Sequence, residues 1–342
     1  MIRRTVLSHF VSQYKCGLCR RFVSRLAEVG KLETPKLEGK YETGQLLLHR
    51  VFGYRGVALF PWNARVYDRD VPQKRDNASD DSSAGYNQVG REVKGHTHTY
   101  YQVLIDSRDC PFVRTQTEAV TFLGNQENSR SLYAIPGLDY VAHEDIIPYT
   151  SLDRQPIQHE LFEKFLFHDP EKDPPFSARE TLKAWQEKNH PWLELSEVHK
   201  ETTENVRVTV IPFYMGCRPS SSGNVYWWRY CIRLENLGEL AVQLRERHWK
   251  ILSLAGNLEN VRGPGVIGQE PVLSKSQPAF QYSSHVSIQA ASGHMWYVSL
   301  FVANKKLGSF RMEREDGYSF DCRIPPFSLD SKHDPNVGAT NS

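Results

Sequence analysis

The stretch "YWWRYCIRLEN", residues 226–236, decides the fold class because its side chains alternate in character. Large apolar residues stand at every second position and would share one face of an extended strand, whereas Arg229, Arg233 and Glu235 fall on the other. Upstream, "VRVTVIPFY" at 206–214 places three valines on one face in the same way. Strand-length runs continue to "FDCRIPPF", with no helical period between them. We therefore predict a β-sandwich over residues 205–330.

A second β-rich region covers residues 41–150. The runs "GQLLLHRVFGYRGVALFPW" and "HTHTYYQVLI" have the length and the composition of strands. Between them, residues 71–94 are polar and rich in Asp, Ser, Asn and Gly, which predicts a long mobile loop and a candidate site for a partner or a modification. The chain is thus expected to be mainly β, with two β-domains.

Residues 151–204 have a different character and predict a helical connector. "IQHELFEKFLF" carries apolar residues at helical spacing, and "ARETLKAWQEKNH" follows Ser177 and Glu180, which have the spacing of a capping box. Pro191 is expected to end this second helix. The connector holds seven basic and twelve acidic residues, which we interpret as a solvated surface.

The N-terminus has the composition of a mitochondrial transit peptide. Residues 1–27 contain six basic and no acidic side chains, without the apolar core of a secretory signal. We assign residues 1–35 to a transit peptide and leader, and 331–342 to a flexible tail. No window is apolar enough to span a membrane, and the six scattered cysteines suit free thiols better than a disulfide framework.

The stretch "VRGPGVIGQEP" at 261–271 contains the glycine spacing of a dinucleotide-binding fingerprint. That fingerprint needs a following helix and an acidic residue about twenty positions on. Pro271 follows at once instead, and residues 271–312 contain no Asp or Glu. No nucleotide cofactor is therefore expected. A weaker alternative stays open, in which the protein is an anion- or nucleotide-responsive binding protein. The backbone N–H groups of Gly263, Gly265 and Gly268 would then form an anion-binding loop, assisted by Arg262.

Two further patterns bear on enzymatic and DNA-binding functions. His159 in "HELFE" lacks the second histidine of a zinc protease, and no nucleophile motif is found, so we expect neither a metal site nor an enzyme. Tyr54, Arg55, Trp62 and Arg65 interleave basic and aromatic side chains as a nucleic-acid surface would. Their region nevertheless holds eleven basic and fourteen acidic residues, which argues against tight DNA binding and favours core and turn roles.

Several independent motifs resemble known families. "YCIRLENLGELAVQLRERHWKI", "VRGPGVIGQEPVL" and "DGYSFDCRIPPFSL" look like the ApaG domain, and "YETGQLLLHRVFGYRGV" with "YVAHEDIIPY" resembles the YccV-like domain. The succession of both after a basic leader is similar to the animal family of polymerase delta-interacting proteins. One departure is "YVSLFVANKKL" at 297–307, which is inserted where the family passes directly to the next strand, either as a longer hairpin or as a mis-spliced segment.

This resemblance implies an SH3-like small barrel for residues 41–150 and a fibronectin-like or immunoglobulin-like sandwich for 205–330. It also implies a non-enzymatic adaptor of the mitochondrial matrix, with a nuclear pool. The implied partners are the small subunit of DNA polymerase delta, the sliding clamp, translesion polymerases and the mitochondrial ClpXP protease. The segment "QLLLHRVF" at 45–52 half-matches a clamp-binding motif, but we interpret it as the first strand of the barrel.

Overall fold

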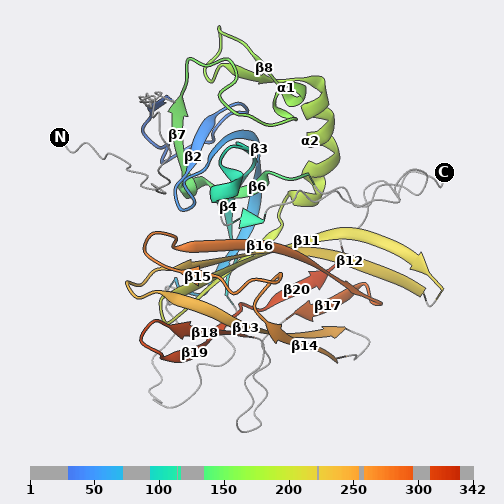
Figure 1. The fold of residues 1–342 in the computed structure, drawn as a ribbon. Helices are drawn as coiled ribbons and strands as arrows, with labels where there is room; N and C mark the ends of the chain where they lie inside the picture. Colours follow the sequence, from blue (N-terminus) through green and yellow to red (C-terminus); the bar gives the residue numbers. More distant parts are fainter. Residues whose placement is uncertain are drawn as a thin grey trace, which may run out of the picture.

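The computed structural model describes residues 30–71, 93–113, 115–116, 135–221, 223–253, 258–295 and 309–331. The predicted transit peptide, the loop at 71–94, the insertion at 297–307 and the C-terminal tail lie wholly or almost wholly outside these ranges. Those four expectations therefore stay predictions. Figure 1 shows the first domain, drawn mainly in blue and green, above the sandwich in yellow to red.

The first domain is built from five principal strands and three short elements. Its elements are β1 (Lys31–Leu32), β2 (Leu46–His49), β3 (Arg55–Asp68), β4 (His96–Ile105), η1 (Cys110–Phe112), β6 (Leu138–Ala142), η2 (His143–Asp145) and β7 (Ile146–Thr150). The principal strands lie in the order β7-β2-β3-β4-β6, and the 3-10 turn η2 connects β6 to β7. No pairing joins β6 to β7 in the described residues, so the closed barrel is not confirmed, whereas the mainly β class is.

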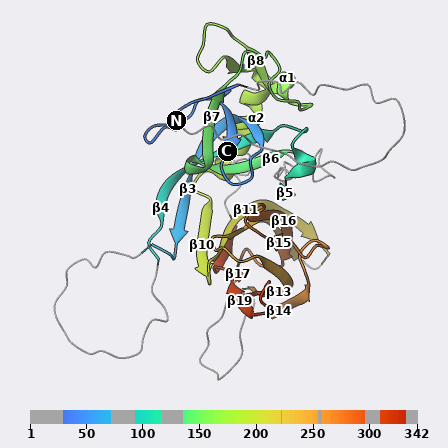
Figure 2. The ribbon, with the colours of Figure 1, turned by 60° about the vertical axis from the view of Figure 1, so that its left-hand side comes forward.

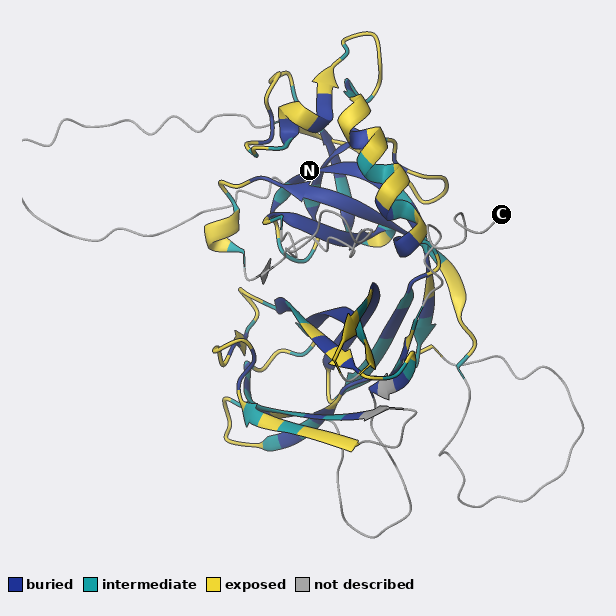
Figure 3. Ribbon diagram, turned by 90° about the vertical axis from the view of Figure 1, so that its right-hand side faces the viewer, coloured by how far each residue is buried: buried dark blue, intermediate teal, exposed yellow. Residues whose placement is uncertain are grey.

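The connector contains the helices α1 (Phe162–Phe165) and α2 (Glu180–Leu193) and the hairpin of β8 (Leu166–His168) and β9 (Phe176–Ala178). The first predicted helix is only one turn long. The His159 ring accepts the Leu161 N–H at 3.0 Å, and this local turn precedes the helix. Figure 3 shows α2 with exposed residues on its outer side and buried residues toward the sheet.

Two predictions about the ends of α2 are wrong. Ser177 does not cap the helix, because it belongs to β9 and its hydroxyl accepts from Lys172 at 3.1 Å. The N-cap residue is Arg179, which has extended backbone and no side-chain capping bond. Pro191 does not end the helix either. Trp192 and Leu193 beyond it are buried, and their packing offsets the hydrogen bond that a proline removes.

The sandwich consists of two sheets. Its strands are β10 (Glu197–Thr203), β11 (Val206–Ser220), β12 (Gly223–Asn236), β13 (Val242–Ser253), β14 (Leu258–Pro264), β15 (Val272–Leu273), β16 (Ala279–Ile288), β17 (Ser292–Met295), β18 (Ser309–Arg314), β19 (Ser319–Arg323) and β20 (Phe327–Asp330). One sheet contains β10-β11-β12-β16, with β5 (Thr115–Gln116) beside β16, and the other has the order β19-β18-β13-β17-β20. The alternation read from "YWWRYCIRLEN" is confirmed, because Trp228, Ile232 and Leu234 are buried on one face of β12.

The two domains share one sheet. β10 pairs antiparallel with β11 on one side and parallel with the C-terminal half of β3 on the other, with Glu197 opposite Arg65 and Lys200 opposite Asp68. The result is a single eleven-stranded sheet that passes from the first domain into the sandwich (Figure 2). Residues 197–203, which the sequence assigns to the helical connector, are therefore the strand that joins the domains.

Candidate functional site at the domain junction

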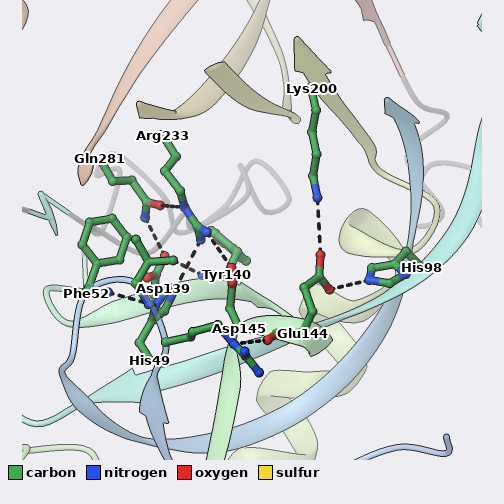
Figure 4. A network of polar contacts seen from close by, with 12 residues as sticks. His49, Phe52, His98, Asp139, Tyr140, Glu144, Asp145, Lys200, Arg233 and Gln281 are labelled. Carbon is green, nitrogen blue, oxygen red and sulfur yellow. Dashed lines mark hydrogen bonds and ion pairs between the residues drawn. The ribbon is translucent and has the colours of Figure 1, made fainter. Parts of the chain in front are cut away.

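Arg233 is the centre of a polar network between the domains (Figure 4). It lies on the face of β12 that is turned toward the first domain, and it is only 8% exposed. Its guanidinium donates to Asp145 Oδ2 at 2.6 Å and to Gln281 Oε1 at 3.1 Å. The ring of Phe52 lies 5.5 Å from the guanidinium carbon, within the range of a cation–π contact. One side chain of the sandwich thus contacts two separate segments of the first domain.

Asp139 extends the network into the first domain, where it is completely buried. It accepts hydrogen bonds from the Tyr54 hydroxyl at 2.6 Å, the Gln281 side-chain amide at 2.7 Å and the Tyr140 N–H at 2.7 Å. Burial raises the pKa of Asp139 and raises that of Tyr54 well above its usual value. Gln281 connects Arg233 to Asp139, so the chain of polar contacts crosses the junction without interruption.

His49 lies beside Arg233 and is held as a neutral imidazole. Its Nδ1 accepts the N–H groups of Val51 at 3.1 Å and Phe52 at 3.3 Å, which places the ring proton on Nε2. Nε2 is 3.5 Å from the Arg233 guanidinium, and since both atoms then carry hydrogen this is a contact between two donors. Burial, followed by the charge of Arg233, lowers the pKa of His49 to about 3.

A second cluster of charged side chains lies at the junction, beside β10. Glu144 accepts from His98 Nε2 at 2.5 Å and pairs with Lys200 Nζ at 3.4 Å. Burial alone would raise the pKa of Glu144, but the hydrogen bond from His98 and the charge of Lys200 outweigh it and lower the pKa to about 2. The carboxylate is therefore ionised at neutral pH and bridges the two domains.

Between these groups lies a cavity of about 70 Å³. Three cationic and three anionic side chains are among its lining residues, namely Lys200, Arg207, Arg233, Glu144, Asp145 and Glu235. The space suits ordered water better than an organic cofactor. In the described part of the chain no group of three His, Cys, Asp or Glu is arranged to hold a metal ion. The arrangement supplies paired charges for holding two domains together.

The predicted aromatic and basic surface does not form one patch. Trp62 is buried against Tyr100, Tyr140 and Phe213, and Tyr54 is equally buried beside Asp139. Neither ring is accessible for stacking a base, so this part of the prediction is wrong and the core interpretation holds. Arg55 is fixed by Asp109, with two bonds of 2.8 and 2.7 Å, and Arg65 is exposed on β3.

The predicted anion-binding loop is engaged within the chain. Arg262 pairs with Glu246 at 2.6 Å, and Gly263 lies within β14. The N–H of Gly265 donates to the Arg245 carbonyl at 2.8 Å, and the carbonyl of Gly265 accepts from Arg247 at 2.8 Å. Both Gly265 and Gly268 have positive φ, which explains the choice of glycine. Anion binding here stays a prediction, and these contacts weigh against it.

The segment at 45–52, which half-matches a clamp-binding motif, forms β2 and the turn after it. Leu46 and Leu47 are buried in the cores on the two faces of this strand, as the strand interpretation requires. The residues of the junction, by contrast, were not singled out from the sequence. One sequence feature could have indicated the junction. On the second face of "YWWRYCIRLEN", Trp227 and Cys231 alternate with the arginines, and such apolar residues indicate that another part of the protein covers this face.

Comparisons with known proteins agree with the two-domain structure. The family model of the ApaG domain matches residues 217–298, and the model described as "Hemimethylated DNA-binding protein YccV like" matches residues 39–172. The described helices include none that is both long and apolar enough to cross a membrane. Protein ApaG of Paramagnetospirillum magneticum is 39% identical over 137 residues, which cover 40% of this chain and 96% of that protein.

Two animal proteins match across both domains. Polymerase delta-interacting protein 2 of Mus musculus is 68% identical over 315 residues, which cover 90% of this chain and 81% of the mouse protein. The Homo sapiens protein of the same name is 67% identical with the same coverage. Identity at this level over both domains and the connector leaves one conclusion: the chain belongs to the polymerase delta-interacting protein 2 family.

Proposed function

We propose that this protein is a non-enzymatic adaptor that binds components of the DNA polymerase delta machinery. The observation that carries the proposal is the 67–68% identity, over 90% of the chain, to relatives named for an interaction with polymerase delta. The shared sheet and the Arg233 network support it, because they hold the two domains in a fixed arrangement. A partner that contacts both domains then meets a single preformed surface.

The specific partners in this proposal are the polymerase delta small subunit, the sliding clamp, translesion polymerases and the mitochondrial ClpXP protease. The adaptor would act in DNA replication and damage tolerance, in the mitochondrial matrix and in a nuclear pool. The basic N-terminal composition supports the mitochondrial part. Imaging of a C-terminal fluorescent fusion, with and without residues 1–35, tests this location. Equal distribution of both fusions through the cytosol would contradict it.

The binding test uses the whole chain, because β10 is paired with β3 and the domains do not divide cleanly. Purified protein is titrated against purified polymerase delta small subunit and, separately, against the sliding clamp, at physiological salt. Saturable micromolar or tighter binding to the small subunit is expected. Crosslinking followed by mass spectrometry would then identify the contact face. Absence of binding to both partners would overturn the adaptor as stated.

Direct DNA binding is the less favoured alternative. The YccV-like family model is described as a hemimethylated-DNA binder, but the aromatic residues Tyr54 and Trp62 are buried in this chain. Arg55 is held by Asp109 rather than presented to solvent as a free cation. A fluorescent hemimethylated duplex titrated at physiological salt is expected to show no saturable binding in the micromolar range.

A further inference from the structure

The sandwich contains a groove of about 510 Å³ between its two sheets. From the first sheet it is lined by Tyr230, Tyr282 and Val286, and from the second by Arg247, Trp249 and Ile251, among others. The volume lies within the range of small-molecule sites, which are mostly apolar with a few convergent polar groups. This groove is separate from the junction, since it shares no lining residue with the junction cavity. Residues of β14 and of the glycine loop also line it, and its other polar side chains are Glu259, Ser284, His285 and Ser287.

The Tyr282 hydroxyl is the unusual group in this groove. The side chain is only 2% exposed, and its hydroxyl has no hydrogen-bond partner among the described residues. Burial raises the pKa of Tyr282 well above 10.0, so the hydroxyl keeps its proton and is available as a donor. An unpaired buried hydroxyl costs stability unless something accepts its hydrogen bond. The hydroxyl is therefore a donor for which no described residue provides an acceptor.

Arg247 places a positive charge at the same end of the groove. Its Nη1 donates to the carbonyls of Pro264 at 2.9 Å and Gly265 at 2.8 Å, which fixes the guanidinium. Its charge acts on the hydroxyls of both Tyr230 and Tyr282. Glu259 is a carboxylate at the groove, and it lies on the exposed strand β14 opposite Ile251, whereas Arg247 is opposite Gly263. This end of the groove thus combines the positive charge of Arg247 with the unpaired hydroxyl of Tyr282.

We propose that this groove binds a small monocarboxylate with an apolar body, such as a medium-chain fatty acid or an aromatic acid. The carboxylate accepts a hydrogen bond from Tyr282 and faces Arg247, and the apolar body packs against Trp249, Ile251 and Val286. Such a ligand satisfies the buried donor and the apolar walls together. The proposal adds a ligand site to the adaptor role and is independent of which protein partner binds.

Octanoate is the probe for the test, and the whole chain is used. Calorimetry and tryptophan fluorescence measure its binding to the wild type, to Tyr282→Phe and to Tyr230→Phe. The last variant is the matched control, since the Tyr230 hydroxyl in the same groove is already bonded to Ser284. We expect saturable octanoate binding that Tyr282→Phe weakens about tenfold or more, as the loss of a hydrogen bond to a charged group does. Tyr230→Phe should change the affinity much less.

Two controls separate this site from a structural role. Octan-1-ol has the same apolar chain without the charge and should bind more weakly than octanoate. The unliganded Tyr282→Phe variant should be at least as stable as the wild type in urea, because the substitution removes an unpaired hydroxyl. Equal binding of octanol and octanoate, unchanged affinity in Tyr282→Phe, or no saturation at millimolar octanoate would each overturn the proposal. So would destabilisation by Tyr282→Phe, which would show that the hydroxyl already has a hydrogen-bond partner in the unliganded protein.

Discussion

Replacement of Arg233 by methionine should destabilise the protein more than the loss of any surface ion pair. Methionine keeps a long unbranched side chain but removes the charge and the bonds of 2.6 Å to Asp145 and 3.1 Å to Gln281. Asp145 is nearly buried, so its carboxylate would be left without its main partner. Breaking a buried ion pair on one side costs about 3–5 kcal/mol, most of it from the unpaired charge that remains.

The assay is urea unfolding at neutral pH, followed in parallel by tryptophan fluorescence and circular dichroism. The matched control is Arg311→Met, which removes an exposed pair with Asp321 at 3.5 Å and should cost at most about 1 kcal/mol. In a double-mutant cycle, Arg233→Met with Asp145→Asn should cost less than the sum of the single changes by about 2 kcal/mol, because the buried charge is removed with its partner. The wild type should unfold with both probes coinciding, whereas Arg233→Met should separate them as the domains uncouple. An Arg233→Met variant no less stable than Arg311→Met would refute the reasoning.

Two further predictions concern acid stability and the glycine loop. The His49 pKa is about 3 in the folded chain and about 6.5 when unfolded, so between these values the unfolded chain binds more protons. The free energy of unfolding should therefore fall as the pH drops from 6.5 toward 3, by up to about 1.4 kcal/mol per pH unit from this residue. His49→Asn, which keeps an acceptor for the Val51 N–H, should lower that slope; an unchanged slope in pH-dependent urea titrations would contradict the assignment. Gly265→Ala should cost more than the roughly 1–2 kcal/mol expected for positive φ alone, since its Cβ would lie 2.1 Å from the Gln269 carbonyl oxygen. Gly268→Ala has open space around the added methyl group, so it should cost only the free energy that positive φ imposes on alanine. Equal urea midpoints for the two variants would contradict this explanation.

The mainly β class could be predicted from the sequence, because its strand patterns are dictated by burial. The strict alternation in β11 and β12 has only one arrangement that buries every second large residue. The same pattern cannot show what covers the opposite face. Arg233 and Gln281 are polar residues within strands, and their partners lie in segments far away in the sequence. Their roles depend on tertiary contacts that no local pattern encodes.

The errors at the connector have a common physical cause. Capping-box spacing, a proline and apolar periodicity are local preferences worth about 1–3 kcal/mol each, and tertiary packing overrode all three. Ser177 belongs to β9 and not to the helix start. The helix continues past Pro191 because Trp192 and Leu193 beyond it are buried. The polar run "EVHKETT" was similarly not recognisable as β10, since it is defined by strands on both of its sides.

The parallel pair of β3 and β10 also has a consequence for how the chain folds during synthesis. The N–H of Thr202 donates to Asp70, 132 residues earlier, so the C-terminal half of β3 acquires its second neighbour only after the connector has been made. Until then, a growing chain exposes an unpaired strand edge, the kind of surface that invites pairing with other chains. Long-range pairing of this type also slows folding. The first domain is therefore completed only when residues 197–200, which pair with 65–68, have been synthesised.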